Sequence, residues 1–544
     1  MRLGRSWQQF IKYTGDSPLA VALAVFIIAF VVGIYLQLHG SFADPDSFYH
    51  ARMATLIRDQ GLITDFRWLP FTVLSDNYIN QHFLYHVLLI PFISVSGPLV
   101  GIKLATIFIT AVMSTVFYGL LRSFQVRGSF IYTMLLLFVN PFMFRIGLAK
   151  APGLAITLTL IGLWLIFHYR YKWLFWFAWF YVWVYGGFAV LLITATTAAI
   201  VGAVRKWIIK RQRHRSFLYR ITEQLANRRT ETTKPRLNLK IFLAAAIGVI
   251  AGLIINPTFP SNIIFYYYQL IKIGILNYQN TIGVGGEWYP YAFTELVPAT
   301  IFVSILVVLG LLAFALQFRK MSMRSWTMLL LTAFFFVLTL KSRRYVEYYV
   351  PIGILFGAFA VNDGLSGNVA KAMMADLKVS LKRSWGARVL AVIVIGYLVI
   401  GAAGVAIRDL RGVRNDLANG LPYDLYKASA TWLKDNAPDN AIIVHSDWDE
   451  FPILFYYNTD NRYIAGLDAT FLYDHDPDRY WEWVHLTTGE LEEHLIYSTV
   501  ADDLEAEYVF LTKDHMAMDN LISGVAGFSL VYEDSEAKIY QAIR

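Results

Sequence analysis

The sequence has no cysteine and little charge. The absence of Cys excludes disulfides, thiolate ligands for a metal and a thiolate nucleophile. Only 16% of the 544 residues are charged, whereas 57% are hydrophobic and 16% are aromatic. This composition is typical of a protein that crosses a membrane several times, and it argues against a soluble globular protein.

Acidic residues are missing from a long stretch, because no Asp or Glu lies between Asp76 and Glu223. They gather in the last part of the chain. Residues 408–544 hold 26 Asp and Glu against 10 Lys and Arg, a net charge of −16. Residues 1–407 hold 13 acidic against 37 basic residues, a net charge of +24. We therefore expect a transmembrane domain over 1–407 and a soluble domain over 408–544.

Apolar runs in the first 407 residues predict a polytopic α-helical protein with about 11 spans. The loop 205–240 holds 12 Lys and Arg against two Glu, the strongest signal for a cytoplasmic loop. The basic charge thus follows from membrane orientation and gives no reason to expect a nucleic-acid partner. The expected spans are at about 19–38, 100–121, 130–147, 153–168, 172–186, 187–203, 241–255, 299–318, 326–340, 349–361 and 389–407.

This orientation places two long loops, 39–98 and 257–297, outside a cell (cytoplasmic) membrane, together with the C-terminal domain. A further apolar run at 82–94 is expected to lie in the membrane interface, since a crossing there would put the basic loop outside. The C-terminal domain alternates helix and strand patterns. A helix is expected over 422–436, and strands over 441–444, 508–512, 528–532 and 538–542, which predicts a small extracytoplasmic α/β domain with a mixed sheet.

Two carboxylates, Asp44 and Asp46, follow directly on the first span and flank Pro45. The proline fixes its own φ and favours an extended conformation for Asp44, so the carboxylates are expected on a bend. A helix should follow, with His50 and Arg52 near its start. Oxygen ligands on such a turn suit a divalent cation and, through it, a phosphate. The alternative is a polar turn in which Asp46 caps the helix.

Three further groups are candidates for a site on the same side. Glu287 ends a glycine-rich run over 281–287 and could close over the turn, or it is a solvated loop acid. The segment 445–452 places Trp448 and several acids at the end of an expected strand, where sites are common, although a surface turn is the alternative. Basic residues lie at the outer ends of two spans, where they could bind phosphate or simply anchor the helices. These residues are Arg145, Lys150, Arg343 and Arg344.

Together these motifs resemble the catalytic subunit of oligosaccharyltransferases, within the GT-C superfamily of polyprenyl-phosphate-dependent glycosyltransferases. The segment 44–50 is similar to the first-loop acidic motif of that family. The segment 281–288 resembles its flexible external loop, and 342–349 its arginine-bearing segment near the acceptor pocket. Residues 446–451 lie where the family carries a Trp-Trp-Asp-Tyr-Gly signature. The resemblance covers the layout of the whole chain but only about thirty residues in motifs.

The resemblance implies a fold and an activity. The fold would be of the GT-C type with a C-terminal extracytoplasmic α/β domain. The enzyme would transfer a sugar or glycan from a polyprenyl-(pyro)phosphate donor in the membrane lipid to a protein or glycan acceptor on the outer face. Asp46 would be metal ligand or general base, with Asp44 and Glu287 completing the catalytic group. The donor phosphate would be bound by Arg145, Lys150, Arg343 and Arg344; the acceptor by Trp448, Asp449 and Trp288; and Mg²⁺ or Mn²⁺ by Asp46 and Glu287, with His50 as a further candidate ligand.

The chain departs from the family in two motifs. A second acidic motif, expected in the next external loop, is missing, and Arg145 and Lys150 occupy that region. The segment 446–451 keeps Trp448 and Asp449 but differs at the other signature positions, so recognition of an Asn-X-Ser/Thr acceptor is not implied. The alternatives are therefore a monosaccharide transferase with a lipid or glycan acceptor, a lipid or polysaccharide transporter, or a scaffolding protein. A transporter should hold ionisable groups at mid-membrane, whereas here they cluster at outer helix ends.

Overall fold

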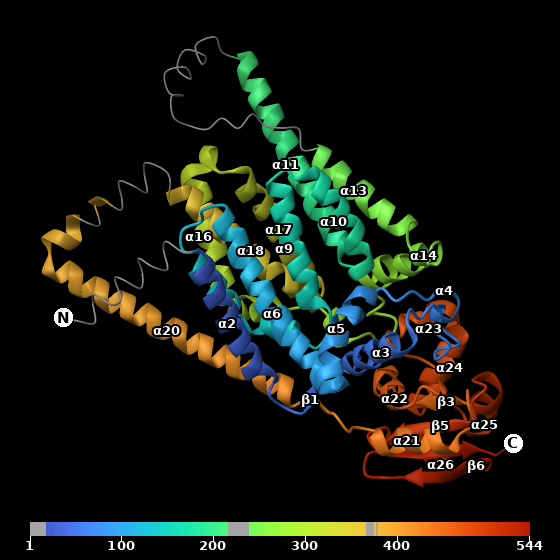
Figure 1. The fold of residues 1–544 in the computed structure, drawn as a ribbon. Helices are drawn as coiled ribbons and strands as arrows, with labels where there is room; N and C mark the ends of the chain where they lie inside the picture. Colours follow the sequence, from blue (N-terminus) through green and yellow to red (C-terminus); the bar gives the residue numbers. More distant parts are fainter. Residues whose placement is uncertain (1–17, 216–238, 366–374, 377–378, 544) are drawn as a thin grey trace.

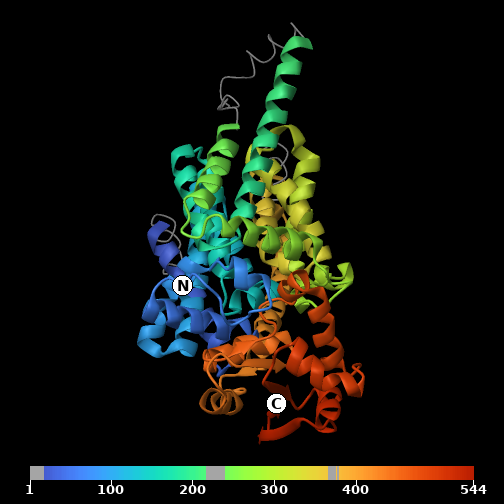
Figure 2. The same cartoon turned by 90° about the vertical axis from the view of Figure 1, so that its right-hand side faces the viewer.

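The computed structural model describes residues 18–215, 239–365, 375–376 and 379–543. Most of the expected basic loop, residues 216–238, lies outside the described residues. A bundle of apolar helices forms the larger part of the molecule, and a sheet domain lies at one end of it (Figure 1). Figure 2 shows that the free end of α11 (Phe188–Arg215) points to the opposite end of the bundle from this domain.

Six helices among the described residues are long and apolar enough to cross a membrane, or up to eight if each bent helix pair counts as one span. The chain is thus a multi-pass membrane protein, although the expected count of 11 is not confirmed. Each of the 11 expected runs does coincide with a helix or a bent pair. These helices are α2 (Pro18–Gln37), α6 (Pro98–Ser123), α7 (Ser129–Leu136), α8 (Asn140–Gly147), α9 (Pro152–Phe167), α10 (Tyr171–Val184), α11, α13 (Leu239–Ile254), α15 (Phe293–Ala299), α16 (Ile301–Gln317), α17 (Met323–Lys341), α18 (Val346–Leu365) and α20 (Trp385–Ala418).

The two bent pairs are α7 with α8, at 69°, and α15 with α16, at 91°. Pro141 lies in the first turn of α8, where its missing N–H costs nothing and its fixed φ favours a new helix start. Pro298 stands inside the last turn of α15 and helps to end it. The break before α8 brings its C-terminal end, with Arg145, and the following loop, with Lys150, to the end of the bundle that faces the sheet domain.

The two long loops that we expect outside the membrane, and name the external loops for that expectation, are built of short helices. The first loop forms α3 (Asp46–Gln60), α4 (Val73–Asn77) and α5 (Phe83–Ser96), which covers the run expected in the interface. The second forms α14 (Ser261–Tyr267), the π-helix η1 (Tyr268–Leu276) and the 3₁₀ turn η2 (Gly286–Trp288). Other single turns are η3 (Phe318–Lys320) and η4 (Arg343–Tyr345).

The C-terminal domain has a five-stranded mixed sheet in the order β4-β3-β5-β7-β6. The first two pairs, β3 with β4 and β3 with β5, are parallel, and the other two are antiparallel. This confirms the expected α/β domain. Its strands are β3 (Ile442–His445), β4 (Arg462–Tyr463), β5 (Tyr508–Thr512), β6 (Phe528–Glu533) and β7 (Ala537–Ala542); its helical elements are α21 (Lys427–Asn436), η5 (Trp448–Glu450), α22 (Phe451–Tyr457), α23 (Thr470–His475), α24 (Pro477–Thr488), η6 (Glu493–Leu495), α25 (Ile496–Ser498), η7 (Thr499–Asp503) and α26 (Met516–Ser523). The expected boundary at 407/408 falls inside α20, which continues to Ala418.

The first loop and the C-terminal domain are locked together. Strand β1 (Ser41–Phe42) pairs antiparallel with β2 (Leu421–Pro422). The approach is so close at Gly420 that a Cβ atom there would lie 2.1 Å from the carbonyl oxygen of Phe42. Helix α3 packs against α22, and Arg52 donates to the Thr459 hydroxyl at 2.9 Å. The turn that holds Asp44 and Asp46 is therefore fixed between the bundle and the domain.

Candidate active site

A cavity of about 690 Å³ lies where the bundle, both external loops and the C-terminal domain meet. All the expected site residues line it, although they come from five separate parts of the chain. Their roles stay predictions at this point. The residues are Asp44, Asp46, His50, Arg145, Lys150, Glu287, Trp288, Arg343, Arg344, Trp448 and Asp449.

The first group of charges, which we name the lysine site, consists of Asp44, Asp46 and Lys150. The Lys150 ammonium Nζ lies 2.7 Å from Asp44 Oδ1, 2.8 Å from Asp44 Oδ2 and 2.7 Å from Asp46 Oδ2. The three side chains are 21%, 28% and 13% exposed for Asp44, Asp46 and Lys150 respectively, so water reaches the carboxylates at one side only. One cation thus serves two anions, which leaves the lysine site a formal charge of −1.

The two aspartates differ in what else they do. Asp44 Oδ1 accepts the backbone N–H of Asp46 at 3.0 Å and so satisfies a free donor at the start of α3. The capping role considered for Asp46 therefore belongs to Asp44. Asp46 makes no such cap bond. Burial, with a further contribution from the charge of Asp44, raises the pKa of Asp46 to about 6, while Lys150 opposes this rise.

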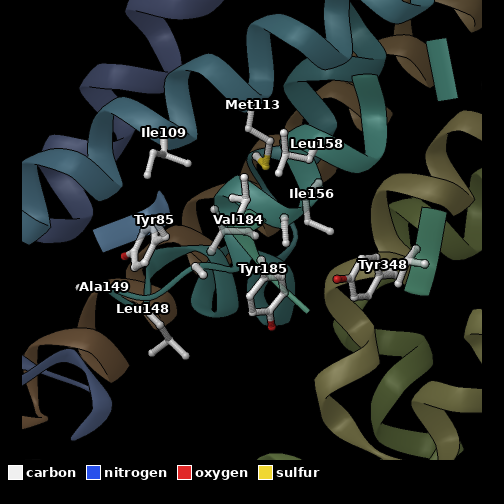
Figure 3. Close-up of a cluster of buried hydrophobic side chains, with 14 of the residues drawn as sticks. Tyr85, Ile109, Met113, Leu148, Ala149, Ile156, Leu158, Val184, Tyr185 and Tyr348 are labelled. Atoms are coloured by element: carbon white, nitrogen blue, oxygen red, sulfur yellow. The ribbon is translucent and has the colours of Figure 1, made fainter. Parts of the chain in front are cut away.

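Lys150 is held in place by its neighbours. Leu148 and Ala149 are 3% and 2% exposed and belong to the buried apolar cluster of Figure 3, beside Tyr85 and Tyr185. The Lys150 backbone N–H donates to the Leu148 carbonyl at 2.7 Å, which closes a tight turn. Burial alone would lower the pKa of Lys150, but the two aspartates raise it above its usual range, so the side chain is charged.

The second group of charges, the arginine site, consists of Arg145, Arg344, Glu287 and Glu347. Glu287 pairs through Oε2 with Arg145 and through Oε1 with Arg344. Glu347, 1% exposed, accepts from Arg145 at 3.2 Å on the other side. Two cations balance two anions, so the formal charge is zero. Burial alone would raise the pKa of Glu287, but the two arginines outweigh it and hold that pKa well below its usual range.

The loop of Glu287 is docked by its own backbone. The Ser342 hydroxyl donates to the Glu287 carbonyl at 2.9 Å, and Asn277 donates to the Trp288 carbonyl at 2.9 Å. The Trp288 ring is 5% exposed and lies under the Arg344 guanidinium, 4.8 Å from its carbon. Trp288 thus supports Arg344 and lines the cavity, and its contact with an acceptor stays a prediction.

The two adjacent arginines of η4 face different ways. Arg344 also donates to the Tyr185 hydroxyl at 2.9 Å. Arg343 is exposed, donates to the Pro290 carbonyl at 3.2 Å and lies 5.5 Å from the centre of the Tyr291 ring. The structure therefore places Arg343 at the rim of the cavity, against the second external loop, and Arg344 inside it.

The C-terminal domain contributes the side of the cavity opposite the bundle. Asp447 and Glu450 form a capping box at η5. The backbone N–H of Asp449 donates to the Asp447 carboxylate. This box fixes the turn that presents Trp448 and Asp449. The Trp448 ring reaches the Gly285 backbone, since a Cβ built there would lie 3.7 Å from it. Trp448 therefore lies beside the loop of Glu287 and Asp449 lines the same cavity, while their contact with an acceptor stays a prediction.

His50 does not join the carboxylates. It is 3% exposed and its Nδ1 shares a hydrogen bond of 2.8 Å with His86 Nε2. Burial, with the neighbouring His82 and His86, lowers the pKa of His50 well below its usual value. The ring is therefore a neutral part of a histidine and aromatic cluster on the wall of the cavity. This hydrogen bond uses Nδ1 alone, so the expected role of His50 as a metal ligand stays a prediction.

The expected metal site on Asp46 and Glu287 is not formed either. Lys150 occupies the Asp46 carboxylate and two arginines occupy Glu287. Across the ranges that the structure describes, no three His, Asp or Glu side chains gather so that they could hold a metal ion. The physical reason is that Asp44, Asp46 and Glu287 already have cationic side chains as their partners.

Two residues of the cavity region were missed by the sequence analysis. Glu347 lies in the first turn of α18 and pairs with Arg145; a carboxylate at the start of an apolar helix needs a cationic partner, and that was the available signal. Asp468 lines the cavity from the segment after β4 and accepts the Thr470 N–H at 2.9 Å. Nothing in its local sequence distinguishes it from the other 25 acids of the C-terminal domain.

No family model and no curated protein sequence matches the chain. Solved structures do. The archaeal oligosaccharyltransferase AglB from Archaeoglobus fulgidus, in complex with an inhibitory peptide and a dolichol-phosphate, superposes with a TM-score of 0.58 and 15% identity over 96% of this chain and 74% of that one. The same archaeal enzyme in complex with Zn and sulfate gives 0.56 and 14%, over 95% and 73%.

A second kind of structure covers this chain end to end. ArnT from Cupriavidus metallidurans, bound to undecaprenyl phosphate, gives a TM-score of 0.53 and 13% identity over 97% of this chain and 98% of that one. At such identities the likeness concerns the fold. The resemblance expected from the motifs is thereby confirmed, and the chain has the fold of the GT-C glycosyltransferases.

Proposed function

We propose that the protein is a glycosyltransferase that uses a polyprenyl-(pyro)phosphate sugar donor on the outer face of the cytoplasmic membrane. The observation that carries this proposal is the lysine site: a carboxylate with a pKa of about 6 lies at the wall of a cavity that also holds two arginines. A general base works best when its pKa is near the working pH. The arginines supply the fixed cations that an anionic leaving group needs.

The roles of the residues follow from their positions. Asp46 takes the proton of the acceptor nucleophile, and Asp44 holds the start of α3 and Lys150. The acceptor atom forms a bond to C1 of the sugar, and the bond between C1 and the phosphate oxygen breaks with its electron pair going to that oxygen. Attack from the side opposite the phosphate inverts the configuration at C1. Lys150, Arg145 and Arg344 stabilise the negative charge on the departing phosphate.

Glu287 takes part by exchange. In the ligand-free protein its carboxylate pairs with Arg145 and Arg344. It thus occupies the position in which a donor phosphate would bind these arginines. Donor binding would displace Glu287 towards the acceptor side, where Trp448 and Asp449 lie. Glycines 283, 285 and 286 give the preceding loop the freedom that this movement needs.

The donor and acceptor classes are proposed from the same likeness. The neighbouring structures hold dolichol-phosphate and undecaprenyl phosphate, which supports a polyprenyl carrier. One of them also holds a peptide, which supports a protein acceptor and an oligosaccharyltransferase reaction. The capping box at η5 replaces part of the expected signature, so a glycan acceptor fits the cavity as well.

A divalent cation does not fit the residues present. Mg²⁺ and Mn²⁺ need several oxygen ligands, and the expected ligands Asp46 and Glu287 are paired with Lys150, Arg145 and Arg344. The Zn and sulfate complex belongs to the archaeal enzyme. No step of the mechanism proposed for this chain therefore passes through a metal.

The test uses the purified full-length protein in lipid nanodiscs with a total lipid extract from the source membranes. Mass spectrometry before and after incubation identifies which lipid-linked sugar is consumed and whether polyprenyl (pyro)phosphate appears. We expect consumption by the wild type and none by Asp46→Asn. Movement of an intact lipid-linked sugar across the bilayer without its cleavage would contradict the proposal and favour a transporter.

A further inference from the structure

The cation that joins the two catalytic carboxylates is part of the chain. Lys150 Nζ contacts Asp44 and Asp46 at 2.7 Å each, so it lies between the two groups as a shared counterion. A divalent ion held by the same two carboxylates would lie at about 2.0–2.6 Å from their oxygens, which is nearly the same place. A metal and the ammonium cannot occupy that place together.

We propose that the Lys150 ammonium permanently replaces a divalent cation in this active site, so that donor binding and transfer need no metal. The inference rests on the proposed function for its substrate. It concerns this chain's own residues. The loop between α8 and α9 carries Lys150 in the region where a second acidic motif would supply a third acidic ligand.

The anchoring of Lys150 supports a fixed counterion. Its side chain is 13% exposed and stands on the buried Leu148 and Ala149. A tethered ammonium does not dissociate, whereas a metal held by two partly exposed carboxylates would exchange with the solvent. The lysine site thus keeps its geometry in every step.

The wider sequence supports the same inference. No acid lies between Asp76 and Glu223, so α6 to α11 supply no carboxylate to this end of the cavity. Among the described residues, the other acids that line this cavity are Glu287, Asp416, Asp449 and Asp468, and Glu287 is paired with two arginines. A metal at Asp44 and Asp46 would therefore have to displace Lys150, and among the described residues no third acid gathers with these two so that they could hold a metal ion.

The ammonium also suits the chemistry. It carries three N–H donors and can contact a phosphate oxygen while it remains between the carboxylates. Its charge lowers the cost of a phosphate beside Asp46, which is the task that a metal would otherwise perform. A divalent metal carries two positive charges, whereas the ammonium carries one. The two arginines are therefore needed to balance the remaining negative charge of the leaving group.

The first experiment measures metal binding and needs no knowledge of the substrate. Electron paramagnetic resonance follows free Mn²⁺ during titration of the full-length protein. We expect no saturable Mn²⁺ site in the wild type. Lys150→Asp places a third carboxylate beside Asp44 and Asp46 and should create one site per chain, which Asp46→Asn in the same background removes. Saturable binding by the wild type that Asp46→Asn abolishes would overturn the proposal.

A matched control separates this effect from the loss of any lysine. Lys272 pairs with Asp474 at 3.4 Å, is 24% exposed and does not line the cavity. Lys272→Asp should therefore leave Mn²⁺ binding as in the wild type. If it creates the same Mn²⁺ site as Lys150→Asp, the binding is not specific to the lysine site and the proposal fails.

The second experiment measures ligand binding and turnover with a chelator. Farnesyl phosphate, a short polyprenyl phosphate, should bind the wild type equally with and without EDTA, and binding should weaken by at least tenfold in Lys150→Met. Turnover of the lipid extract should also be unchanged by EDTA, fall on the order of 10²-fold in Lys150→Met and recover in part in Lys150→Arg. Loss of wild-type turnover in EDTA, or full turnover by Lys150→Met, would overturn the proposal.

The two experiments also separate this proposal from the proposed function. A wild type that binds no Mn²⁺ and binds farnesyl phosphate through Lys150, but consumes no lipid-linked sugar, keeps the lysine as the phosphate-binding counterion and refutes the transferase. A wild type that consumes a lipid-linked sugar only when Mn²⁺ is present keeps the transferase and refutes the lysine.

Discussion

The lysine site and the arginine site use the same kinds of groups in different proportions. In the lysine site one ammonium serves two carboxylates that are 21% and 28% exposed. In the arginine site two guanidinium groups serve two carboxylates, and Arg145 and Glu347 are 7% and 1% exposed. The first site has a net formal charge of −1 and the second has none.

This difference assigns different chemistry to the two sites. A surplus of carboxylate favours proton uptake, and the pKa of Asp46 is raised to about 6. A balance of charges keeps Glu287 ionised, and its pKa is held well below its usual range. We infer that proton transfer takes place at the lysine site and anion binding at the arginine site. Both sites consist of basic side chains in contact with carboxylates, so the ratio of the two makes the difference.

The largest expected effect is that of Asp46→Asn. Asn is no base, so turnover of the lipid-linked sugar should fall by about 10²–10⁴-fold. The change barely alters volume, and the start of α3 is capped by Asp44, so folding should be unaffected. Asp59→Asn is the matched control, because Asp59 lies at the other end of α3, exposed and paired with Arg58. Full activity of Asp46→Asn would remove the lysine site from the chemistry.

A smaller effect is expected at the arginine site. Glu287→Gln removes the carboxylate that a donor phosphate must displace. A hydrogen bond to a charged group is worth about 1.5–3 kcal/mol, so farnesyl phosphate should bind about 10- to 100-fold more tightly by calorimetry. Turnover should fall, because the phosphate product then stays bound to both arginines.

Glu295→Gln is the control for this change, because Glu295 is an exposed acid of the same external segment and does not line the cavity. It should leave binding and turnover as in the wild type. Weaker phosphate binding by Glu287→Gln would mean that Glu287 supports the donor and does not compete with it. The distinction between the two sites would then be lost.

The pH dependence sharpens the comparison further. A base works when deprotonated, so kcat/KM should fall as the pH drops below about 6, the pKa of Asp46. The charge of Asp44 contributes to the raised pKa, so Asp44→Asn should move this acid limb to lower pH. Asn caps a helix about as well as Asp, so α3 should keep its start. An acid limb that stays in place in Asp44→Asn would mean that another group controls it.

The sequence predicted the membrane helices and the residues of the site better than it predicted which acid pairs with which base. Apolar runs mark helices because the bilayer requires satisfied backbone groups, and each expected run is helical. Acids are so rare in the first 407 residues that Asp44, Asp46 and Glu287 were conspicuous. Which base each would meet was not predictable, because Lys150 and Asp46 come together only through the break between α7 and α8.

The pairing of the expected metal ligands with basic side chains was hidden for a related reason. Carboxylates spaced around a proline suggest oxygen ligands, but they attract any cation, and a lysine far along the chain competes with a metal for them. The available signal was the missing second acidic motif, because Lys150 lies in the region where that motif would supply an acidic ligand. The role of His50 was equally hidden, because its partner His86 lies in α5, a helix whose packing against α3 follows from the fold and from no local pattern.

The smallest expected effect separates two adjacent arginines. Arg343 is exposed at the rim, where its guanidinium donates to Pro290 and lies over Tyr291. An exposed contact of this kind is worth about 0.5–1 kcal/mol, so Arg343→Ala should change farnesyl phosphate binding by only about two- to fivefold. Arg344→Ala removes a side chain that holds Glu287, Tyr185 and Trp288 at once, and should weaken binding far more. Both variants lose the same charge from the same turn, so overall electrostatics cannot explain a difference between them. Equal losses would show that the donor phosphate binds at the rim, and that the arginine site is a structural ion pair.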